Sequence, residues 1–467
     1  MLWNYFTEVA IFQTATPFPP AYRYPSPMTS HLWHPCTQMQ HHEAAPPLAI
    51  ARGEGAWLID SNGTRYLDAI SSWWVNLFGH CNPRINAALI DQLGKIEHVI
   101  LAGCSHAPVL ELSERLAKLT GLDHAFYGSD GASAVEIALK MSFHTWKNSG
   151  RPQKTGFVSL KGSYHGETLG ALSVTDVAIF RDTYAPLLRH SHQVMSPDAR
   201  QALPGETAAG VARRAAADLE AWLAEHAHTT AALIVEPLVQ CAAGMAMYDP
   251  EYLRLARALC DRYEIHLIAD EIAVGFGRTG TLFACEQADI RPDFICLSKG
   301  LTGGYLPLAC VLTTDRVYDA FYNPDVRLGF LHSHSYTGNP LACRAALAVL
   351  DIFDADAVLA QNRSKAAAFN TLLEPLRQHP RVRHFRHLGM IWAFEVADAA
   401  PSFARDFHLA ARDSGVLLRP IGNTVYFMPP YIVGEAEMAL LLKTGLNLLN
   451  SASEPSVSNP PSAPAVP

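Results

Sequence analysis

Short apolar segments that alternate with longer helical patterns constrain the fold of this chain more than any other feature. Gly, Ser or Pro lies within two residues after most of these segments, and most lead toward a helical pattern. This alternation favours an α/β fold with a mostly parallel sheet, because parallel strands are joined by crossover helices. The predicted strands are residues 125–127, 156–160, 232–235, 266–269, 294–297 and 309–313.

The sequence changes character beyond the last of these strands. An Ala/Leu-rich helix is predicted at residues 341–353, and the residues after it mix strands and helices. Near the other end, WLIDSNGTRYLDA at 57–69 predicts two strands joined by a turn at Asn62-Gly63. We therefore predict a small domain from residues 28–70 and 351–449, beside a large domain from residues 71–350. Residues 1–27 are predicted to be an N-terminal extension and residues 450–467, rich in Ser and Pro, a disordered tail.

Composition excludes several classes of protein. The chain has 467 residues, of which 49% are hydrophobic, so a sizeable core is expected. Its net charge is −8 and it has no long basic run, so we expect no nucleic-acid partner. No apolar stretch reaches the roughly eighteen residues of a membrane-spanning helix, so we expect no membrane association.

Cysteines and histidines do not follow the patterns of structural sites. The nine cysteines are scattered, odd in number and never spaced as C-x-x-C, which favours a reducing, cytoplasmic location. The histidines at 41–42 and in the run HSHS at 332–335 have no carboxylate partner at ligand spacing. We therefore predict neither a disulfide framework nor a metal site.

Asp270 and Lys299 each stand at the end of a predicted buried strand, where ligands bind in such sheets. Lys299 precedes a flexible glycine pair, and loss of solvent there would depress the pKa of its amine and make it nucleophilic toward a carbonyl. An acid at a neighbouring strand end can hold a protonated heterocycle nitrogen opposite that lysine. The pair suits pyridoxal phosphate. Asp and Lys at strand ends are more often structural, so the spacing alone leaves both interpretations open.

A phosphate site is suggested where FYGSDGASAVEIALKM runs from a predicted strand into a helix. Free backbone amides around Gly131 and Ala132, together with the helix dipole, would attract an anion. Ser133 and Glu136 have the spacing of a capping box. A well-capped helix without a ligand would show the same pattern, so that alternative stays open.

Gly275, Gly277 and Gly280 match the G-x-G-x-x-G motif of dinucleotide-binding folds. However, the acidic pair Asp270-Glu271 directly precedes the motif and would repel a pyrophosphate. The segment after Gly280 is also too short for the long helix that the motif requires. We therefore do not expect a dinucleotide here.

Several motifs, in a fixed order, carry a resemblance to a known family. ADEIAVGFGRTG at 269–280, LSKGLTGGYLPLA at 297–309 and SHSYTGNPLACRAA at 333–346 resemble class III (omega) aminotransferases, which have the fold-type I architecture of pyridoxal-phosphate enzymes. Four more segments resemble the subgroup that transfers an amine from S-adenosyl-L-methionine to 8-amino-7-oxononanoate in biotin synthesis. They are LWHPCTQM at 32–39, ISSWWVNLFGH at 70–80, GSYHGETLGALSV at 162–174 and LLRPIGNTVYFMPPYI at 417–432.

The resemblance implies how the cofactor, pyridoxal 5'-phosphate, would be held. Lys299 would bind it covalently and then move the proton between the substrate and the cofactor. Asp270 would pair with the ring nitrogen, while Ile272 and Tyr164 would pack on opposite ring faces. The phosphate would be bound by Gly131, Ala132 and Ser335, with Ser335 reaching it from the partner subunit of a homodimer. Ala132 stands where the family often has Ser, and its backbone amide can still donate.

The resemblance also implies a substrate site. Arg419 would bind a carboxylate bidentately, as guanidinium geometry favours. Glu167 stands where relatives often carry Asp beside the amine of S-adenosyl-L-methionine, and Cys36 where some carry Tyr. The pocket would be lined by Trp73, Trp74 and Tyr426, whose flat rings suit an aliphatic chain or an adenosyl group.

Two alternatives follow from this resemblance. The first is another omega-aminotransferase, with lysine, 4-aminobutyrate, ornithine or β-alanine as amino donor. It stays open because Cys36, in place of Tyr, removes a ring and a hydroxyl from the pocket. A non-catalytic protein of the same fold, acting as a regulator, is the second, and the intact pair of Asp270 and Lys299 argues against it.

Overall fold

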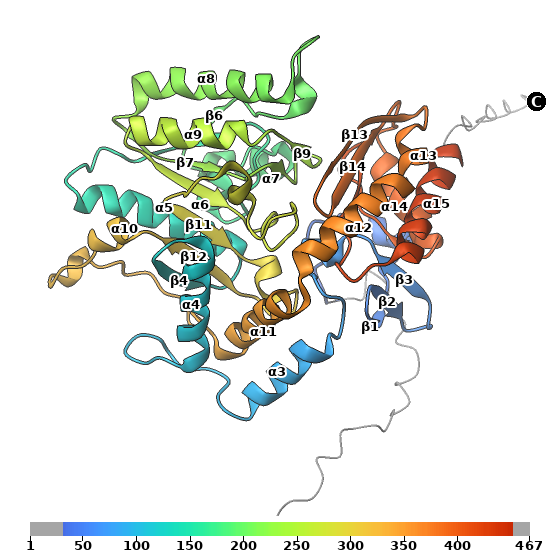
Figure 1. Ribbon diagram of the computed structural model, residues 1–467, viewed down its shortest axis with the longest axis horizontal. Helices are drawn as coiled ribbons and strands as arrows, with labels where there is room; N and C mark the ends of the chain where they lie inside the picture. Colours follow the sequence, from blue (N-terminus) through green and yellow to red (C-terminus); the bar gives the residue numbers. More distant parts are fainter. Residues whose placement is uncertain (1–30, 452–467) are drawn as a thin grey trace, which may run out of the picture.

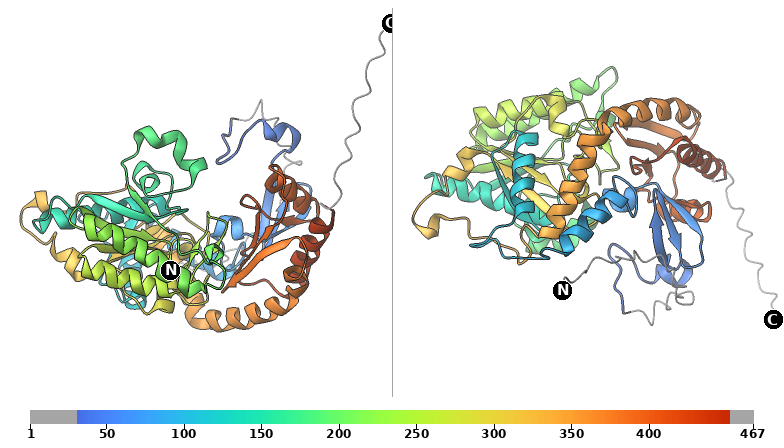
Figure 2. Two further views of the ribbon diagram at one scale, coloured as in Figure 1. Left: turned by 90° about the horizontal axis from the view of Figure 1, so that it is seen from above. Right: turned by 60° about the horizontal axis from the view of Figure 1, so that its bottom comes forward.

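The computed structural model describes residues 31–451. The predicted extension at 1–27 and residues 452–467 of the predicted tail lie outside the described residues, whereas residues 450 and 451, predicted to belong to that tail, end a helix. The chain forms a larger lobe around one wide sheet and a smaller lobe beside it (Figures 1 and 2). No helix in the described part of the chain combines the length and the apolarity that a bilayer crossing requires.

The wide sheet contains all six predicted strands, so those predictions are confirmed. Its order is β4-β12-β11-β10-β7-β5-β6. The pairs from β11 to β6 are parallel, whereas β12 runs antiparallel to both β11 and β4. The strands are β4 (His124–Gly128), β5 (Gly156–Leu160), β6 (His192–Val194), β7 (Thr230–Val235), β10 (His266–Asp270), β11 (Phe294–Leu297) and β12 (Ala309–Thr313).

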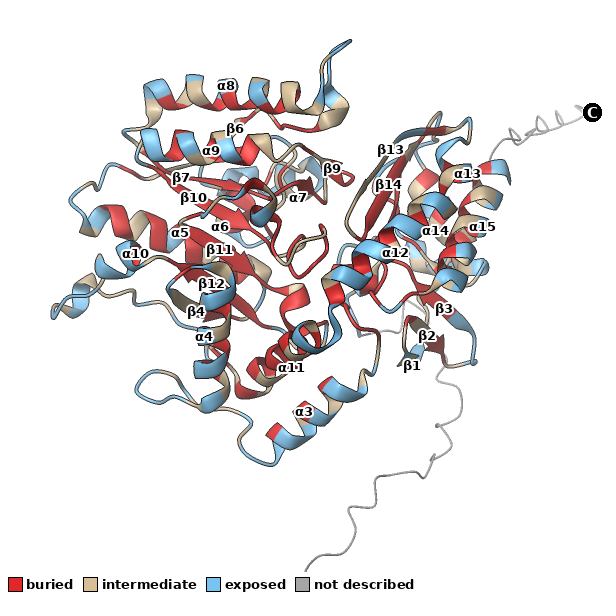
Figure 3. Ribbon diagram, in the orientation of Figure 1, coloured by how far each residue is buried: buried red, intermediate tan, exposed pale blue. Residues whose placement is uncertain are grey.

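Helices cover both faces of this sheet, so its central strands β7 and β10 are buried along their whole length (Figure 3). Ile234 and Ile268 pack with the buried face of α5, while Leu233 and Leu267 pack in the cluster that includes residues of α8 and α9. Neighbouring residues of one strand therefore enter different cores. The helices are α4 (Ala107–Thr120), α5 (Gly131–Asn148), α8 (Ala208–His226) and α9 (Glu251–Arg262), with shorter α6 (Leu169–Ser173), α7 (Ala178–Arg181) and α10 (Asp315–Asp319).

The smaller lobe brings together segments from both ends of the described chain. The hairpin predicted at 57–69 is present as β2 and β3, and β3 pairs in parallel with β15 from the far end of the sequence. A second sheet has the order β13-β14-β16. The strands are β1 (Ile50–Glu54), β2 (Trp57–Asp60), β3 (Arg65–Asp68), β13 (Val382–Leu388), β14 (Ile391–Val396), β15 (Val416–Leu417) and β16 (Thr424–Phe427), and the helices α1 (His41–Ala44), α12 (Val358–Leu372), α13 (Glu374–Arg377), α14 (Phe403–Asp413) and α15 (Glu435–Ser451).

One helix runs between the lobes. The Ala/Leu-rich helix predicted at 341–353 is α11 (Pro340–Asp356), and it packs against α3 (Pro83–Leu93) and α4 (Figure 1). Asn339 caps its first turn by accepting a hydrogen bond from the Ala342 amide. The predicted domain boundary at 350/351 falls inside this continuous helix, and the division of the chain into domains stays a prediction.

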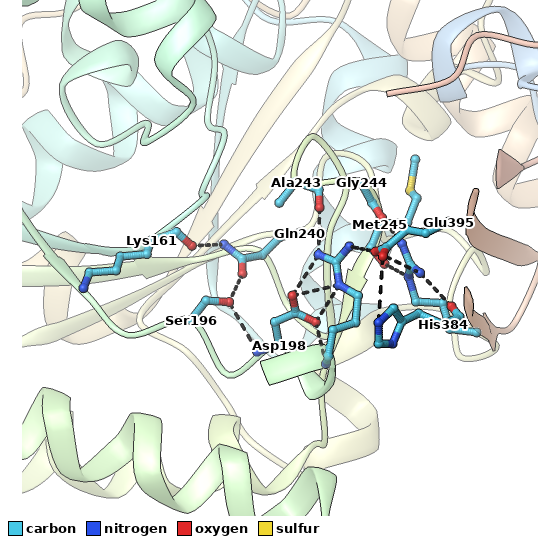
Figure 4. A network of polar contacts seen from close by, with 11 residues as sticks. Lys161, Ser196, Asp198, Gln240, Ala243, Gly244, Met245, His384 and Glu395 are labelled. Carbon is cyan, nitrogen blue, oxygen red and sulfur yellow. Dashed lines mark hydrogen bonds and ion pairs between the residues drawn. The ribbon is translucent and has the colours of Figure 1, made fainter. Parts of the chain in front are cut away.

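A network of charged side chains also joins the two lobes (Figure 4). Arg200, in the larger lobe, donates to Glu395 of β14 at 2.6 Å and to Asp198 at 2.9 Å. Arg386 of β13 donates to the Met245 carbonyl of the larger lobe at 2.8 Å. The side chains of Arg200 and Glu395 are 20% and 18% exposed, so this ion pair is largely desolvated.

Replacement of Glu395 by Ala should destabilise the protein by about 1–3 kcal/mol, because Arg200 and Arg386 would lose a charged partner in a partly buried place. Glu220→Ala is the matched control, since its ion pair with Arg262 lies in solvent and should contribute about 0–1 kcal/mol. The free energies of unfolding from urea titrations measure both effects. Equal losses for the two variants would contradict a stabilising role for the network.

Candidate active site

A cavity of about 460 Å³ opens beyond the carboxyl ends of β7 and β10 and at the N-terminus of α5. Its position agrees with the rule that ligands bind beyond the carboxyl ends of parallel strands. The predicted site residues that line it are Trp74, Gly131, Ala132, Tyr164, Glu167, Asp270, Ile272 and Lys299. The structure thus gathers most of the predicted site in one place.

Lys299 begins a 3-10 turn directly after β11 and has a left-handed backbone, with φ of 44°. Its amine lies 4.6 Å from the centroid of the Trp74 ring. The lysine is half-buried because it faces the cavity, yet the surrounding protein atoms desolvate the amine. This desolvation lowers the pKa of Lys299, and the nearby carboxylate of Asp270 only partly opposes it. The shift moves the amine toward its neutral, nucleophilic form.

Asp270 ends β10 and is buried. Its Oδ2 lies 2.7 Å from Nδ1 of His165, and its Oδ1 accepts a hydrogen bond from the Ile272 amide at 3.1 Å. An ionised carboxylate can only accept, so Nδ1 of His165 carries the proton in this pair. His165 was not among the predicted site residues. In the structure its side chain is buried, lines the cavity and orients Asp270.

Glu236 is a cavity residue that our sequence analysis missed. It directly follows β7 and is buried, and its carboxylate accepts hydrogen bonds from the amides of Tyr164 and Cys241, each at 3.1 Å. Burial raises the pKa of Glu236 to about 7, although the nearby His165 lowers it. Glu236 directly follows a predicted strand, as Asp270 does. A search of the residues at strand ends could therefore have found it.

The predicted capping box of Ser133 and Glu136 is wrong. Asp130 is the N-cap of α5, and its carboxylate accepts from the Ser133 amide at 2.9 Å and from the Ser133 hydroxyl at 2.8 Å. Glu136 instead accepts from the Thr168 hydroxyl at 2.6 Å and from the Gly170 amide at 2.7 Å. Asp130 starts the helix three residues before Ser133, so Glu136 lies one turn too far along to reach back to the cap.

The start of α5 has the geometry of an anion cradle. The amides of Gly131 and Ala132 belong to the first helical turn, where backbone donors have no intrahelical acceptor. A Cβ at Gly131 would lie 3.1 Å from Cγ2 of Ile272, and one at Gly166 would lie 2.7 Å from Cβ of Ala132. This close packing leaves a narrow floor to the cavity, which is lined by backbone amides.

Trp73 and Trp74 lie in a short turn, α2 (Ser71–Trp74), whose residues all have positive φ, including 73° at Trp73 and 71° at Trp74. The buried carboxylate of Asp68 holds this turn by accepting from the amide and the hydroxyl of Ser72 at 2.9 and 2.7 Å. Trp74 is buried and donates its indole N–H to the Tyr426 hydroxyl at 3.1 Å. Trp74 thus lines the cavity and Tyr426 supports it from behind, whereas Trp73 is 41% exposed.

Arg419 and Cys36 do not line the cavity but lie close to its residues. The guanidinium of Arg419 stacks 4.7 Å from the centroid of the Trp73 ring and donates to the Cys36 carbonyl at 3.2 Å. Burial and the charge of Glu167 raise the pKa of the Cys36 thiol. Tyr164 donates to Glu167 at 2.8 Å, and burial together with this contact raises the pKa of Tyr164.

Ser335 is exposed in the loop before α11 and does not line the cavity of its own chain. Its predicted contact with a phosphate across a subunit interface stays a prediction. The G-x-G-x-x-G segment at 275–280 is followed by a 3-10 turn, Ala284–Ala288, whose first two amides donate to Glu271. No long helix follows it, as we expected, and the dinucleotide interpretation is not supported.

The residues present fit pyridoxal phosphate. A desolvated amine at Lys299 suits an aldehyde carbon, and the oriented carboxylate of Asp270 suits a protonated ring nitrogen. Ile272 and Tyr164 both line the cavity and supply surfaces for a flat ring, while the cradle at Gly131 suits a phosphate.

Comparisons with known proteins agree with this site. A model of the family described as aminotransferase class-III matches residues 38–446. The adenosylmethionine-8-amino-7-oxononanoate aminotransferase of Helicobacter pylori is 47% identical over 416 residues, which cover 87% of this chain and 93% of the relative. The enzyme of that name from Geobacter sulfurreducens is 41% identical over 425 residues, covering 88% and 94%.

Solved structures extend the similarity to the fold. The adenosylmethionine-8-amino-7-oxononanoate aminotransferase of Methanocaldococcus jannaschii superimposes with a TM-score of 0.85 at 34% identity, covering 91% of this chain and 98% of the other. An amine transaminase from an uncultivated Pseudomonas species, in its PLP-bound form, gives 0.86 at 32%, covering 90% and 99%. The predicted fold-type I architecture is thereby confirmed. Since the family model spans most of the sequence, the protein belongs to the class III aminotransferases, which use pyridoxal phosphate.

Proposed function

We propose that the protein transfers the amino group of S-adenosyl-L-methionine to 8-amino-7-oxononanoate and so forms 7,8-diaminononanoate for biotin synthesis. The two half-reactions would share one cavity, which implies ping-pong kinetics. The observation that carries the proposal is the meeting of Lys299, Asp270 and Trp74 in one cavity of a chain whose relatives bear this enzyme name.

Pyridoxal phosphate, when bound, supplies a carbon that accepts the amine and a ring that withdraws electrons from the substrate Cα. Asp270 would hold the proton on the ring nitrogen, and His165 would keep the carboxylate in place for it. Lys299 would remove the proton from the substrate Cα and pass it to the cofactor. Its lowered pKa supports this role, because the shift favours the neutral amine, which is the form that can accept a proton.

Both substrates would be recognised by residues around the cavity. Arg419 would bind the carboxylate of 8-amino-7-oxononanoate, since its guanidinium is exposed and stacked on Trp73. Glu167, at the cavity lining, would face the amine of S-adenosyl-L-methionine. The indole of Trp74 would pack against the aliphatic chain or the adenosyl group.

We also propose a homodimer with its active sites at the interface, in which Ser335 of each subunit completes the phosphate site of the other. The exposure of Ser335 outside its own cavity supports this arrangement. A cytoplasmic location is proposed from the cysteines, all of which are free thiols.

Amine transfer from S-adenosyl-L-methionine, with 8-amino-7-oxononanoate as acceptor, tests the proposal directly. The purified protein should form 7,8-diaminononanoate, and Lys299→Ala should lose both this activity and the visible absorbance of the lysine–cofactor linkage. Lysine, 4-aminobutyrate, ornithine and β-alanine serve as competing donors in the same assay. A faster reaction with one of these would assign the protein to a different omega-aminotransferase.

Arg419→Ala should raise the KM for 8-amino-7-oxononanoate about tenfold to a hundredfold, because a hydrogen bond to a charged group contributes about 1.5–3 kcal/mol. Arg405→Ala is the control, since Arg405 is an exposed arginine of the same lobe that pairs with Asp406. Steady-state kinetics with the donor held saturating separates KM from kcat. An unchanged KM would place the carboxylate site elsewhere.

Asp270→Asn should lower kcat by about a hundredfold or more, since a neutral amide cannot stabilise the protonated ring nitrogen. Cofactor content should change little, because the phosphate cradle and Lys299 remain. Single-turnover kinetics and the absorbance of the bound cofactor measure the two quantities separately. Near-normal turnover in this variant would remove Asp270 from the proposed role.

A further inference from the structure

A chain of hydrogen bonds runs from the middle of α5 to the residues just before it. Nζ of Lys140 lies 2.7 Å from Nδ1 of His332, whose Nε2 lies 3.1 Å from Nε2 of His334. Nδ1 of His334 lies 2.8 Å from the hydroxyl of Ser129, which precedes the N-cap Asp130. The two histidines therefore connect the loop before α11 to the start of the anion cradle.

The donors and acceptors of these hydrogen bonds can be arranged in only one direction. A lysine ammonium donates and cannot accept, so Nδ1 of His332 must be the acceptor and its proton must sit on Nε2. That proton then points at Nε2 of His334, which must accept, so His334 carries its proton on Nδ1 and donates to Ser129. Both imidazoles are consequently neutral, each in a defined tautomer. A second proton on either ring would place two donors face to face and break the chain.

We propose that His332 and His334 are positioning residues for the cofactor phosphate. By this relay they fix the loop 331–337, which carries Ser335, against Ser129 at the entrance to α5. The inference rests on the proposed use of pyridoxal phosphate in this cavity, but it is independent of the amino donor. Because the relay requires neutral rings, acid would release the loop and weaken cofactor binding.

The surroundings of His332 favour its neutral form. Its ring packs 5.6 Å from that of Phe330, and Lys140 lies over the same phenyl ring at 5.8 Å. Burial lowers the pKa of His332, Lys140 and His334 lower it further, and Glu136 on α5 opposes them. Imidazole is the side chain that gains its charge between about pH 5 and 8, so protonation of His332 in acid would break the relay. The relay is thus intact at neutral pH and is lost as the pH falls through the lowered pKa.

Glutamine provides a matched replacement, because its carbonyl accepts and its amide donates in the same direction without titrating. The double variant His332→Gln/His334→Gln can keep the relay at every pH. The double variant His332→Phe/His334→Phe keeps the ring shapes but no polar atom. Ser333→Ala, an exposed change between the two histidines, controls for disturbance of the loop.

The measurement is the dissociation constant of pyridoxal phosphate from each variant, followed by absorbance without substrates between about pH 5 and 8. The double Phe variant should bind about threefold to tenfold more weakly than the wild type at neutral pH, as expected for one or two lost hydrogen bonds. The double Gln variant should match the wild type at neutral pH and lose less affinity in acid. Ser333→Ala should follow the wild type.

Wild-type affinity in the double Phe variant, or an unchanged acid loss in the double Gln variant, would overturn the inference. A misfolded Phe variant would leave the Gln comparison as the deciding result. Absence of cofactor binding in the wild type would instead contradict the proposed function. Failure of the donor assay alone would leave the relay untouched.

Discussion

Lys299 and Asp270 lie in a space where protein atoms replace much of the surrounding water, and the other contacts of the site follow from that constraint. A buried charge is tolerated only when it is paired or hydrogen-bonded. Asp270 is hydrogen-bonded to the imidazole of His165, and Glu236 accepts hydrogen bonds from two backbone amides. The amine of Lys299 lies against the ring of Trp74, and desolvation lowers its pKa. The amine that the proposed chemistry uses is thus one that desolvation shifts toward its neutral form.

The left-handed turn at Trp73 and Trp74 shows how such a site is supported from outside. Each non-glycine residue in this conformation costs about 1 kcal/mol or more, so the turn requires compensation. Asp68 provides two hydrogen bonds to Ser72, and the Ser71 hydroxyl donates to the Met428 carbonyl at 2.7 Å. Both anchors belong to the smaller lobe. The position of Trp74 beside Lys299 therefore depends on strands of a different lobe.

Strand ends were predictable from the sequence because a buried parallel strand is mostly apolar, and polar residues gather where its apolar run ends. That rule found Asp270 and Lys299, and applied more fully it would have found Glu236. The cap of α5 was misassigned because Asp130 and Ser133 are both good N-caps, and only the entry angle of the chain decides between them. The exposure of Trp73 could not be predicted from the sequence, because left-handed φ values at serine and tryptophan produce no pattern in composition or periodicity.

Coupling between the lobes follows from the short loop after Glu236. Arg386 of the smaller lobe holds the Met245 carbonyl, and a Cβ at Gly244 would lie 2.7 Å from the Thr424 hydroxyl, so the loop fits tightly against β16. At its other end, Cys241 donates its amide to Glu236. A shift of the smaller lobe would therefore pull on the loop and move the carboxylate that faces the cavity. Because the same lobe carries Arg419, this loop connects the lobe of the proposed carboxylate site to the carboxylate of Glu236 in the cavity through hydrogen bonds.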